Sequence, residues 1–278
     1  MKTAGWCPAP AGGFIFGRSH PAGTAACLRG LPGWPKSRGE RGTTHQGSFP
    51  LRTSIAHILA AASILAAAPA LAAERSFPVS DFSEIVLSGS PEVTVTTGGR
   101  ASVVATGTDS DLDRLDIKVD GKRLLIGTKP GSWNWSSREG VKLRVSVPTL
   151  AAATISGSGD ISVNRVDGPF AGRISGSGEM HLLSVDSPTL SLAISGSGDI
   201  EVAGRCGTGS LSVTGSGDID ASRLTCGTLT ATTTGSGDID ARATETAALR
   251  VTGSGDITVT GGARCTTKTT GSGTTRCS

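Results

Sequence analysis

The chain has 278 residues, with 40 glycines, 4% aromatic residues, no tyrosine and a formal net charge of +3. This composition disfavours an ordinary mixed α/β enzyme core, which relies on aromatic and large aliphatic side chains. Of the 26 basic and 23 acidic residues, seven basic and one acidic lie in 1–72, which leaves 19 basic and 22 acidic residues and a net charge of −3 for 73–278. No nucleic-acid partner is therefore expected.

Residues 51–72 have the features of a secretory signal peptide. Arg52 precedes a long, alanine-rich apolar run, and the A-x-A sequence at 70–72 fits a cleavage site. A transmembrane anchor is the competing interpretation, because the run is about long enough to span a bilayer. Pro69 and the cleavage pattern favour the signal peptide. We expect cleavage after Ala72, a location in the periplasm or outside the cell, and no membrane span in the mature chain.

Residues 1–50 are rich in Gly, Pro and Arg and show neither a helical nor a strand period. A signal peptide normally starts at the N-terminus, so this segment is predicted to be a disordered leader or an extension upstream of a true start at Leu51. Without 1–72 the chain keeps a single histidine, His181, which leaves little material for histidine-based catalysis. We assign no catalytic residues and expect a protein that is not an enzyme.

An internal repeat dominates the rest of the chain. Gly-Ser-Gly recurs at intervals of 18 to 20 residues, beginning at Gly157, Gly176, Gly196, Gly215, Gly235, Gly253 and Gly271. Short segments of alternating apolar and polar residues flank each copy, which indicates strands with one buried face. The glycines permit tight corners. One unit per coil predicts an all-β fold, a right-handed parallel β-helix with coils of about 19 residues.

Stacking of the units predicts two apolar ladders inside the helix. We expect one just after the corner and one just before it, formed by Ile161, Met180, Ile200, Ile219, Ile239 and Ile257 and by Ile174, Ile194, Val213 and Val251. Residues 151–278 would form this repeat region. Residues 73–150 also alternate, with turn signals at 98–99 and 120–121, and we expect antiparallel β-structure that caps the N-terminal end. Ser88-Gly-Ser-Pro91 resembles a degenerate first corner.

The chain resembles the putative auto-transporter adhesin head GIN domain family. The resemblance rests on Phe82-Ser-Glu-Ile85, on SGSPEV at 88–93, on VSVPTL at 145–150 and on the GSGDI series, and it covers nearly all of 77–260. It implies an exported right-handed β-helix with a poorly defined molecular function. We therefore expect a non-enzymatic protein of the cell envelope, or a secreted one, that binds an envelope polysaccharide or a surface protein in the manner of an adhesin.

Two other functions compete with this one. A β-helix enzyme acting on polysaccharide, a lyase or hydrolase, would need a groove built by long inserted loops, and the repeats carry none. A purely structural envelope protein would bind no small ligand. A serine nucleophile at the repeated Gly-Ser-Gly corners would need an activating base, so we interpret these serines as turn residues.

An acidic residue follows most of the Gly-Ser-Gly corners, at Asp160, Glu179, Asp199, Asp218, Asp238 and Asp256. Stacked coils would place these like charges close together, so something must compensate for their repulsion. We favour a structural role, in which each carboxylate accepts hydrogen bonds from N–H groups of its own glycine turn. The alternative is calcium between the coils, held by Asp199, Asp218, Asp238 and Asp256. Otherwise no metal or cofactor is expected.

Trp133 and Trp135 alternate in a polar, Gly/Ser-rich segment. They would form either a hydrophobic lid over the N-terminal part or an exposed aromatic platform for a sugar or protein.

Four cysteines follow the leader, and an even number in an exported chain indicates disulfides. Cys206 and Cys226 are one coil apart, which would bring them within bonding distance. Cys265 and Cys277 would then close the C-terminal end, although other pairings are open.

Overall fold

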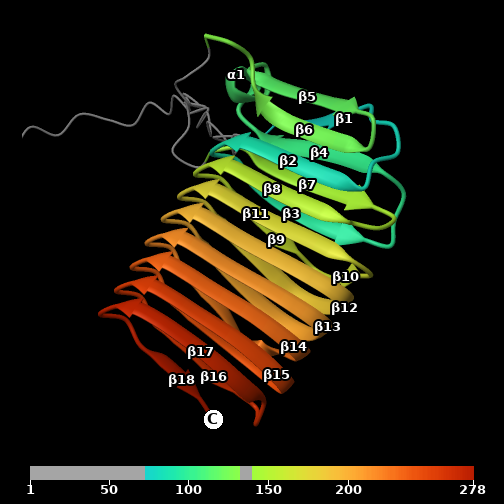
Figure 1. Ribbon diagram of the computed structural model, residues 1–278. Coiled ribbons are helices and arrows are strands. Elements are labelled where there is room, and N and C mark those ends of the chain that lie inside the picture. The colour runs from blue at the N-terminus through green and yellow to red at the C-terminus, as the bar shows by residue number, and fades with distance from the viewer. Residues whose placement is uncertain (1–72, 132–139) are drawn as a thin grey trace, which may run out of the picture. The chain divides into compact units, whose positions relative to one another are not determined.

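The computed structural model describes residues 73–131 and 140–278, and the structural statements below concern these residues. They form one sheet that winds into a parallel β-solenoid of about seven turns, shown in Figure 1. Trp133 and Trp135 lie outside the described residues, as does the predicted leader. Among the described residues, no helix has the length and apolar character needed to cross a membrane.

The repeat region consists of strands that pair in parallel with their counterparts one coil away. They are β8 (Ala152–Gly157), β9 (Asp160–Val163), β10 (Val166–Asp167), β11 (Phe170–Gly176), β12 (Glu179–Gly196), β13 (Asp199–Gly215), β14 (Ile219–Gly235), β15 (Ile239–Gly253), β16 (Ile257–Thr260), β17 (Arg264–Gly271) and β18 (Thr275–Cys277). The register aligns the first glycine of every Gly-Ser-Gly copy with the next, for example Gly196 with Gly215 and Gly215 with Gly235. The predicted coil length is confirmed.

Both predicted apolar ladders are present in the core. The side chains after the corner, from Ile161 to Ile257, are at most 1% exposed, and the side chains before it, from Ile174 to Val251, are at most 2% exposed. One position departs from the pattern, because Thr233 stands between Val213 and Val251 in the register. Its side chain is fully buried, and its hydroxyl has no hydrogen-bond partner among the described residues.

Close stacking of the coils explains why both glycines of the corner recur. Gly215 has φ +127°, a conformation that side-chain-bearing residues rarely adopt. A Cβ atom on Gly215 would collide with the carbonyl oxygen of Gly196, and one on Gly217 would collide with that of Gly198. Between them the Ser216 N–H donates to the Gly196 carbonyl oxygen at 2.9 Å. The corner thus continues the hydrogen-bonded ladder, and its backbones approach too closely for any side chain.

The N-terminal part contains seven further strands and one short helix. They are β1 (Ala73–Phe77), β2 (Glu84–Gly89), β3 (Glu92–Thr97), β4 (Ser102–Gly107), α1 (Asp109–Leu112), β5 (Leu115–Asp120), β6 (Arg123–Thr128) and β7 (Lys142–Val147). Strands β2 and β3 form a complete coil around the degenerate corner, since β2 pairs in parallel with β8 and Gly89 aligns with Gly157. The predicted first corner is confirmed.

The expectation of antiparallel β-structure in the N-terminal part was right for some of its strands and wrong for others. Strands β6 and β7 pair in parallel with β2 and β3, so they form another coil outside the β2–β3 coil. Antiparallel pairing is found between β1 and β4, between β4 and β7 and between β5 and β6. These outer strands cover the end of the core, and α1 adds the buried Leu112. An alternating pattern gives the same signal for both strand directions, which is why the sequence did not distinguish them.

Candidate functional site

The acidic residues after the corners form a ladder along one edge of the solenoid, and their hydrogen bonds run between coils. Asp199 Oδ1 accepts from the Asp218 backbone N–H at 2.9 Å, and Asp218 Oδ1 accepts from that of Asp238 at 2.7 Å. Two further bonds of 2.7 Å continue the series. The Asp256 backbone N–H donates to Asp238 Oδ1, and the Thr274 backbone N–H donates to Asp256 Oδ1. The structural role is therefore present, but its predicted partner was wrong: the N–H belongs to the next coil.

A lower pKa accompanies this bonding at the end of the ladder. The backbone N–H of Thr274, and then its side chain, hold the pKa of Asp256 below the ordinary value of 3.8. In each of these carboxylates, one oxygen accepts the hydrogen bond that a backbone carbonyl oxygen accepts elsewhere in the strand ladder. Among residues 73–131 and 140–278, no cluster of three or more His, Cys, Asp or Glu side chains is placed to hold a metal. Calcium at Asp199, Asp218, Asp238 and Asp256 stays an untested prediction.

His181 belongs to a chain of charged groups that spans three coils. Its Nδ1 lies 3.1 Å from Glu201 Oε2, its Nε2 lies 3.4 Å from Glu179 Oε2, and Arg223 also pairs with Glu201. A shallow hollow of about 230 Å³ is lined by His181, by Glu179 and Glu201 and by Asp218. The sequence analysis missed this network, although the coil length places Glu201 beside His181. The Arg223 guanidinium offsets part of the acidic charge of this edge.

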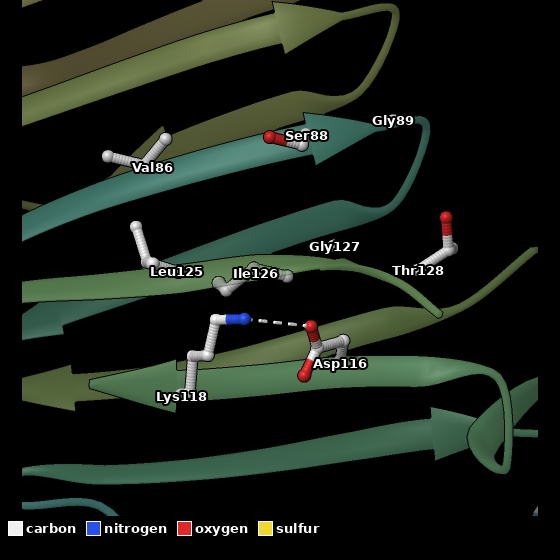
Figure 2. Close-up of a pocket in the computed structure, with 9 residues that line it drawn as sticks. All are labelled: Val86, Ser88, Gly89, Asp116, Lys118, Leu125, Ile126, Gly127 and Thr128. Carbon is white, nitrogen blue, oxygen red and sulfur yellow. Dashed lines mark hydrogen bonds and ion pairs between the residues drawn. The ribbon is translucent and has the colours of Figure 1, made fainter. Parts of the chain in front are cut away.

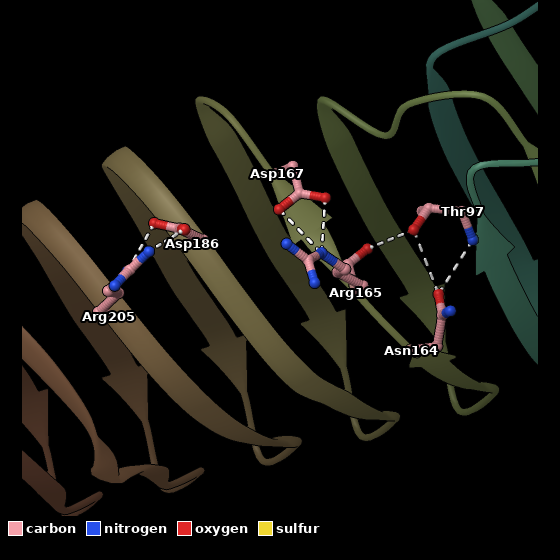
Figure 3. Close-up of polar contacts among 6 residues, drawn as sticks. All are labelled: Thr97, Asn164, Arg165, Asp167, Asp186 and Arg205. Carbon is pink, nitrogen blue, oxygen red and sulfur yellow. Dashed lines mark hydrogen bonds and ion pairs between the residues drawn. The ribbon is translucent and has the colours of Figure 1, made fainter.

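A second series of polar contacts lies on another part of the solenoid, drawn in Figure 3. The Arg205 guanidinium forms two hydrogen bonds with the Asp186 carboxylate, 2.9 and 2.6 Å long, and it lowers the pKa of that carboxyl. Arg165 pairs with Asp167 at 2.7 Å, which raises the pKa of the guanidinium. All four side chains are exposed or half-buried, so these pairs order the surface more than they stabilise the fold.

The four cysteines lie in the two expected pairs. Cys206 and Cys226 are at disulfide distance on neighbouring coils, with Cα atoms 4.5 Å apart. Cys265 and Cys277, with Cα atoms 6.5 Å apart, connect β17 and β18 in the last described coil. The first pair is buried, whereas Cys277 is exposed. The first pair joins register neighbours on adjacent coils, whereas the second joins two successive segments of one coil.

A hollow of about 410 Å³ lies on the outer face of β2, β5 and β6 (Figure 2). Its apolar floor includes Val86 and Leu125, which are register neighbours and half-buried. The recess continues at Gly127, which has no side chain. Lys118 and Asp116 form an ion pair at its rim, with Nζ and Oδ2 3.1 Å apart. An apolar floor with a polar rim is suited to binding a ligand that has both kinds of surface.

The hollow lies at the end of β6 that leads to the predicted tryptophan segment. Thr128 is the last residue of β6 and also lines the hollow, and residues 132–139 follow shortly after in the chain. Sequence reasoning did not find this hollow, because it depends on β5, β6 and β2 being adjacent. The available signal was the outward Leu125 beside Gly127 in an otherwise polar face.

Comparison with solved structures shows that this fold is shared. A putative adhesin from Bacteroides fragilis is 22% identical, with a TM-score of 0.69 over 74% of this chain and 96% of the other. A putative lipid binding protein from Parabacteroides distasonis is 23% identical, with a TM-score of 0.61 over 76% and 98%. A putative adhesin from Parabacteroides merdae is 19% identical, with a TM-score of 0.61 over 76% and 97%. At these identities the likeness establishes the fold alone.

Comparison with curated proteins gives no match. A family model matches residues 81–263, which span the N-terminal coils and nearly all of the repeat region. The family resemblance noted in the sequence is confirmed. The chain belongs to the family described as "Putative auto-transporter adhesin, head GIN domain".

Proposed function

We propose that this protein is an exported, non-enzymatic binding protein of the cell envelope or the extracellular space, which attaches to a polysaccharide or surface protein as an adhesin does. The observation that carries the proposal is the hollow on β2, β5 and β6, with its apolar floor and charged rim on an outer face of the solenoid. The family description supports it. The disulfide-distance cysteine pairs fit a compartment in which disulfides persist.

The hollow and the tryptophan pair are the two binding features proposed for this chain. Val86 and Leu125 offer an apolar floor to the C–H face of a sugar or to an apolar side chain. Asp116 and Lys118 offer hydrogen bonds at the rim. Trp133 and Trp135, in the connection that follows β6, would add the flat aromatic surface that recurs at binding hot spots.

Binding can be tested with the protein expressed with its own leader and applied to an array of envelope polysaccharides, with calcium and with chelator. Gly127→Leu should fill the hollow and weaken binding, since a Cβ atom there meets nothing nearer than Ser88 Cβ at 3.8 Å. The matched control is Ser184→Leu, an exposed serine of β12 that lies outside both this hollow and the row of hydroxyl groups described below. Trp133→Ala and Trp135→Ala should also weaken binding. Unchanged binding in these variants would place the site elsewhere.

Export is tested by sequencing the N-terminus of the same purified protein. Cleavage after Ala72 should give a chain that begins at Ala73. A peptide from 1–50 in the unprocessed precursor would contradict a start at Leu51, and an uncleaved mature protein would contradict the signal peptide. Saturable binding that is lost only with chelator would show that calcium binds the acidic ladder after all.

A further inference from the structure

Two basic side chains lie side by side on the last coils of the solenoid. Arg250 on β15 and Lys268 on β17 are register neighbours, and both are exposed. Neighbouring strands in a ladder are about 4.8 Å apart. Like charges placed directly opposite each other on adjacent strands destabilise a sheet. The repulsion between the two charges therefore lowers the stability of this part of the sheet.

Several basic side chains of the solenoid are neutralised by carboxylates, but these two are not. Arg205 pairs with Asp186 and Arg223 pairs with Glu201. Within the described part of the chain, neither Arg250 nor Lys268 has a carboxylate at ion-pair distance. Both cations are therefore available to an external anion.

A hollow of about 280 Å³ lies at this pair of cations. The register places Ala248 between Thr230 and Thr266, so the small alanine side chain leaves a recess between two hydroxyl-bearing neighbours. Thr232, the next outward residue of β14, is the register neighbour of Arg250. The hollow thus combines two cations that have no carboxylate partner with four threonine side chains, Thr230, Thr232, Thr266 and Thr267, that can donate hydrogen bonds.

We propose that this hollow binds the carboxylate or sulfate groups of an acidic polysaccharide, at a site separate from the hollow on β2, β5 and β6. A guanidinium presents a planar fork that matches the oxygens of such groups, and Lys268 adds a second charge. The row that contains Thr230 continues along the same face through the register neighbours Ser210 on β13 and Ser191 on β12. Hydroxyl groups repeated coil after coil fit an extended polymer better than a compact ligand.

The test measures binding of the full chain to heparin, which carries sulfate, to polygalacturonate, which carries carboxylate, and to neutral dextran. We expect both acidic polymers to bind and dextran to bind much more weakly at this site, with affinity falling as salt is added. Arg250→Gln and Lys268→Gln should each weaken binding about two- to fivefold, and the double variant about tenfold, as expected for exposed ion pairs.

Three controls make the result specific. Arg242→Gln removes the same charge from the same strand, outside the hollow, and should leave affinity unchanged. The charge-conserving double variant Arg250→Lys/Lys268→Arg should retain most of the binding. Thermal unfolding of the control variants should match that of the parent, because the changed side chains are exposed, and the glutamine variants should be at least as stable, because they lose the repulsion between the two charges.

Full affinity of the double glutamine variant for both acidic polymers would overturn the inference, as would equal binding of dextran at this site. Failure of the parent to bind either polymer would also overturn it. Vesicles containing phosphatidylglycerol form a further arm, and binding of these vesicles without the polymers would assign the cations to a lipid headgroup. Loss of array binding in Gly127→Leu would leave this test unaffected, so the two proposals can fail separately.

Discussion

The Asp218 carboxylate accepts a hydrogen bond from the backbone N–H of Asp238, one coil further along the solenoid, at 2.7 Å. The acidic side chain therefore replaces a backbone carbonyl at the corner, where the chain turns and the strand ladder would otherwise lose an acceptor. The repetition of aspartate at this position follows from hydrogen bonding between coils.

The acceptor, more than the charge, should matter at this position. Asp218→Asn keeps an oxygen that can accept from Asp238 and should change the free energy of unfolding by less than about 0.5 kcal/mol, whereas Asp218→Ala should lower it by about 1 kcal/mol. Urea unfolding measures both. Asp240→Ala, an exposed carboxylate on β15, is the control and should have little effect. Equal loss in the Asn and Ala variants would show that charge, not the acceptor, matters.

Stability should fall in acid as the bonded carboxylates are protonated. The pKa values of Asp256 and Asp186 lie below the ordinary 3.8, through hydrogen bonds from Thr274 and Arg205 respectively. A lowered folded-state pKa contributes stability that is complete above the unfolded-state value and is lost as pH falls through the folded-state value. NMR titration of the two carboxyls, with unfolding measured across the same range, checks this. Asp256→Asn should weaken the pH dependence of the free energy of unfolding. An NMR titration midpoint above 3.8 for either carboxyl would contradict the lowered pKa.

Thr233 interrupts an apolar ladder, and its replacement should stabilise the protein. Its hydroxyl is buried without a hydrogen-bond partner among the described residues, and Val213 and Val251 occupy the same position in the coils on either side. Thr233→Val has nearly the same shape and removes the unsatisfied group, so the free energy of unfolding should rise by about 1–2 kcal/mol. Thr234→Val, on the exposed side, is the control. A loss of stability would show that the hydroxyl has a partner, such as buried water.

The cysteine pairs should contribute unequally to global stability. Cys206 and Cys226 are buried and close a loop of 20 residues. Replacing both with alanine should lower the free energy of unfolding by about 3 kcal/mol, on the loop-entropy estimate. Replacing Cys265 and Cys277, which close a shorter loop in the last described coil, should mainly raise hydrogen exchange in β17 and β18. Comparable exchange throughout the solenoid in the second variant would contradict this local role.

The repeat region could be predicted because its period fixes its register. Once coils of 18 to 20 residues are stacked, Ile200 must lie beside Ile219, and Cys206 must lie beside Cys226. The inward positions then follow from alternation alone. This is why a chain with few aromatic residues still revealed its core.

The N-terminal part could not be predicted in the same way. No repeated motif records that β6 lies beside β2, so the hollow formed by Leu125 and Val86 was invisible in the sequence. The donor to the Asp199 carboxylate, the backbone N–H of Asp218, was also not predicted. An aspartate after a glycine turn is equally suited to accept from its own turn and from the next coil, so the residue type does not distinguish the two. The 18-residue interval between Arg250 and Lys268 already implies that they are register neighbours. That neither has a carboxylate partner could not be predicted, because it depends on side chains from several coils.

The inward positions of the last described coil should limit end-to-end association of the solenoid. Thr267 and Thr269 on β17 follow Leu249 and Val251 on β15 in the register, yet both are exposed. An apolar edge strand would offer a template for another chain, and polar residues there weaken such pairing. Thr267→Val/Thr269→Val should therefore cause concentration-dependent self-association, measured by size-exclusion chromatography with light scattering. Thr270→Val, outside the ladder, should not. If the double variant and the control elute alike, the polar side chains are not what prevents self-association. The added apolar surface would then have found no second chain to bury it, and the unpaired backbone groups of the edge strand would have to be kept from pairing in another way.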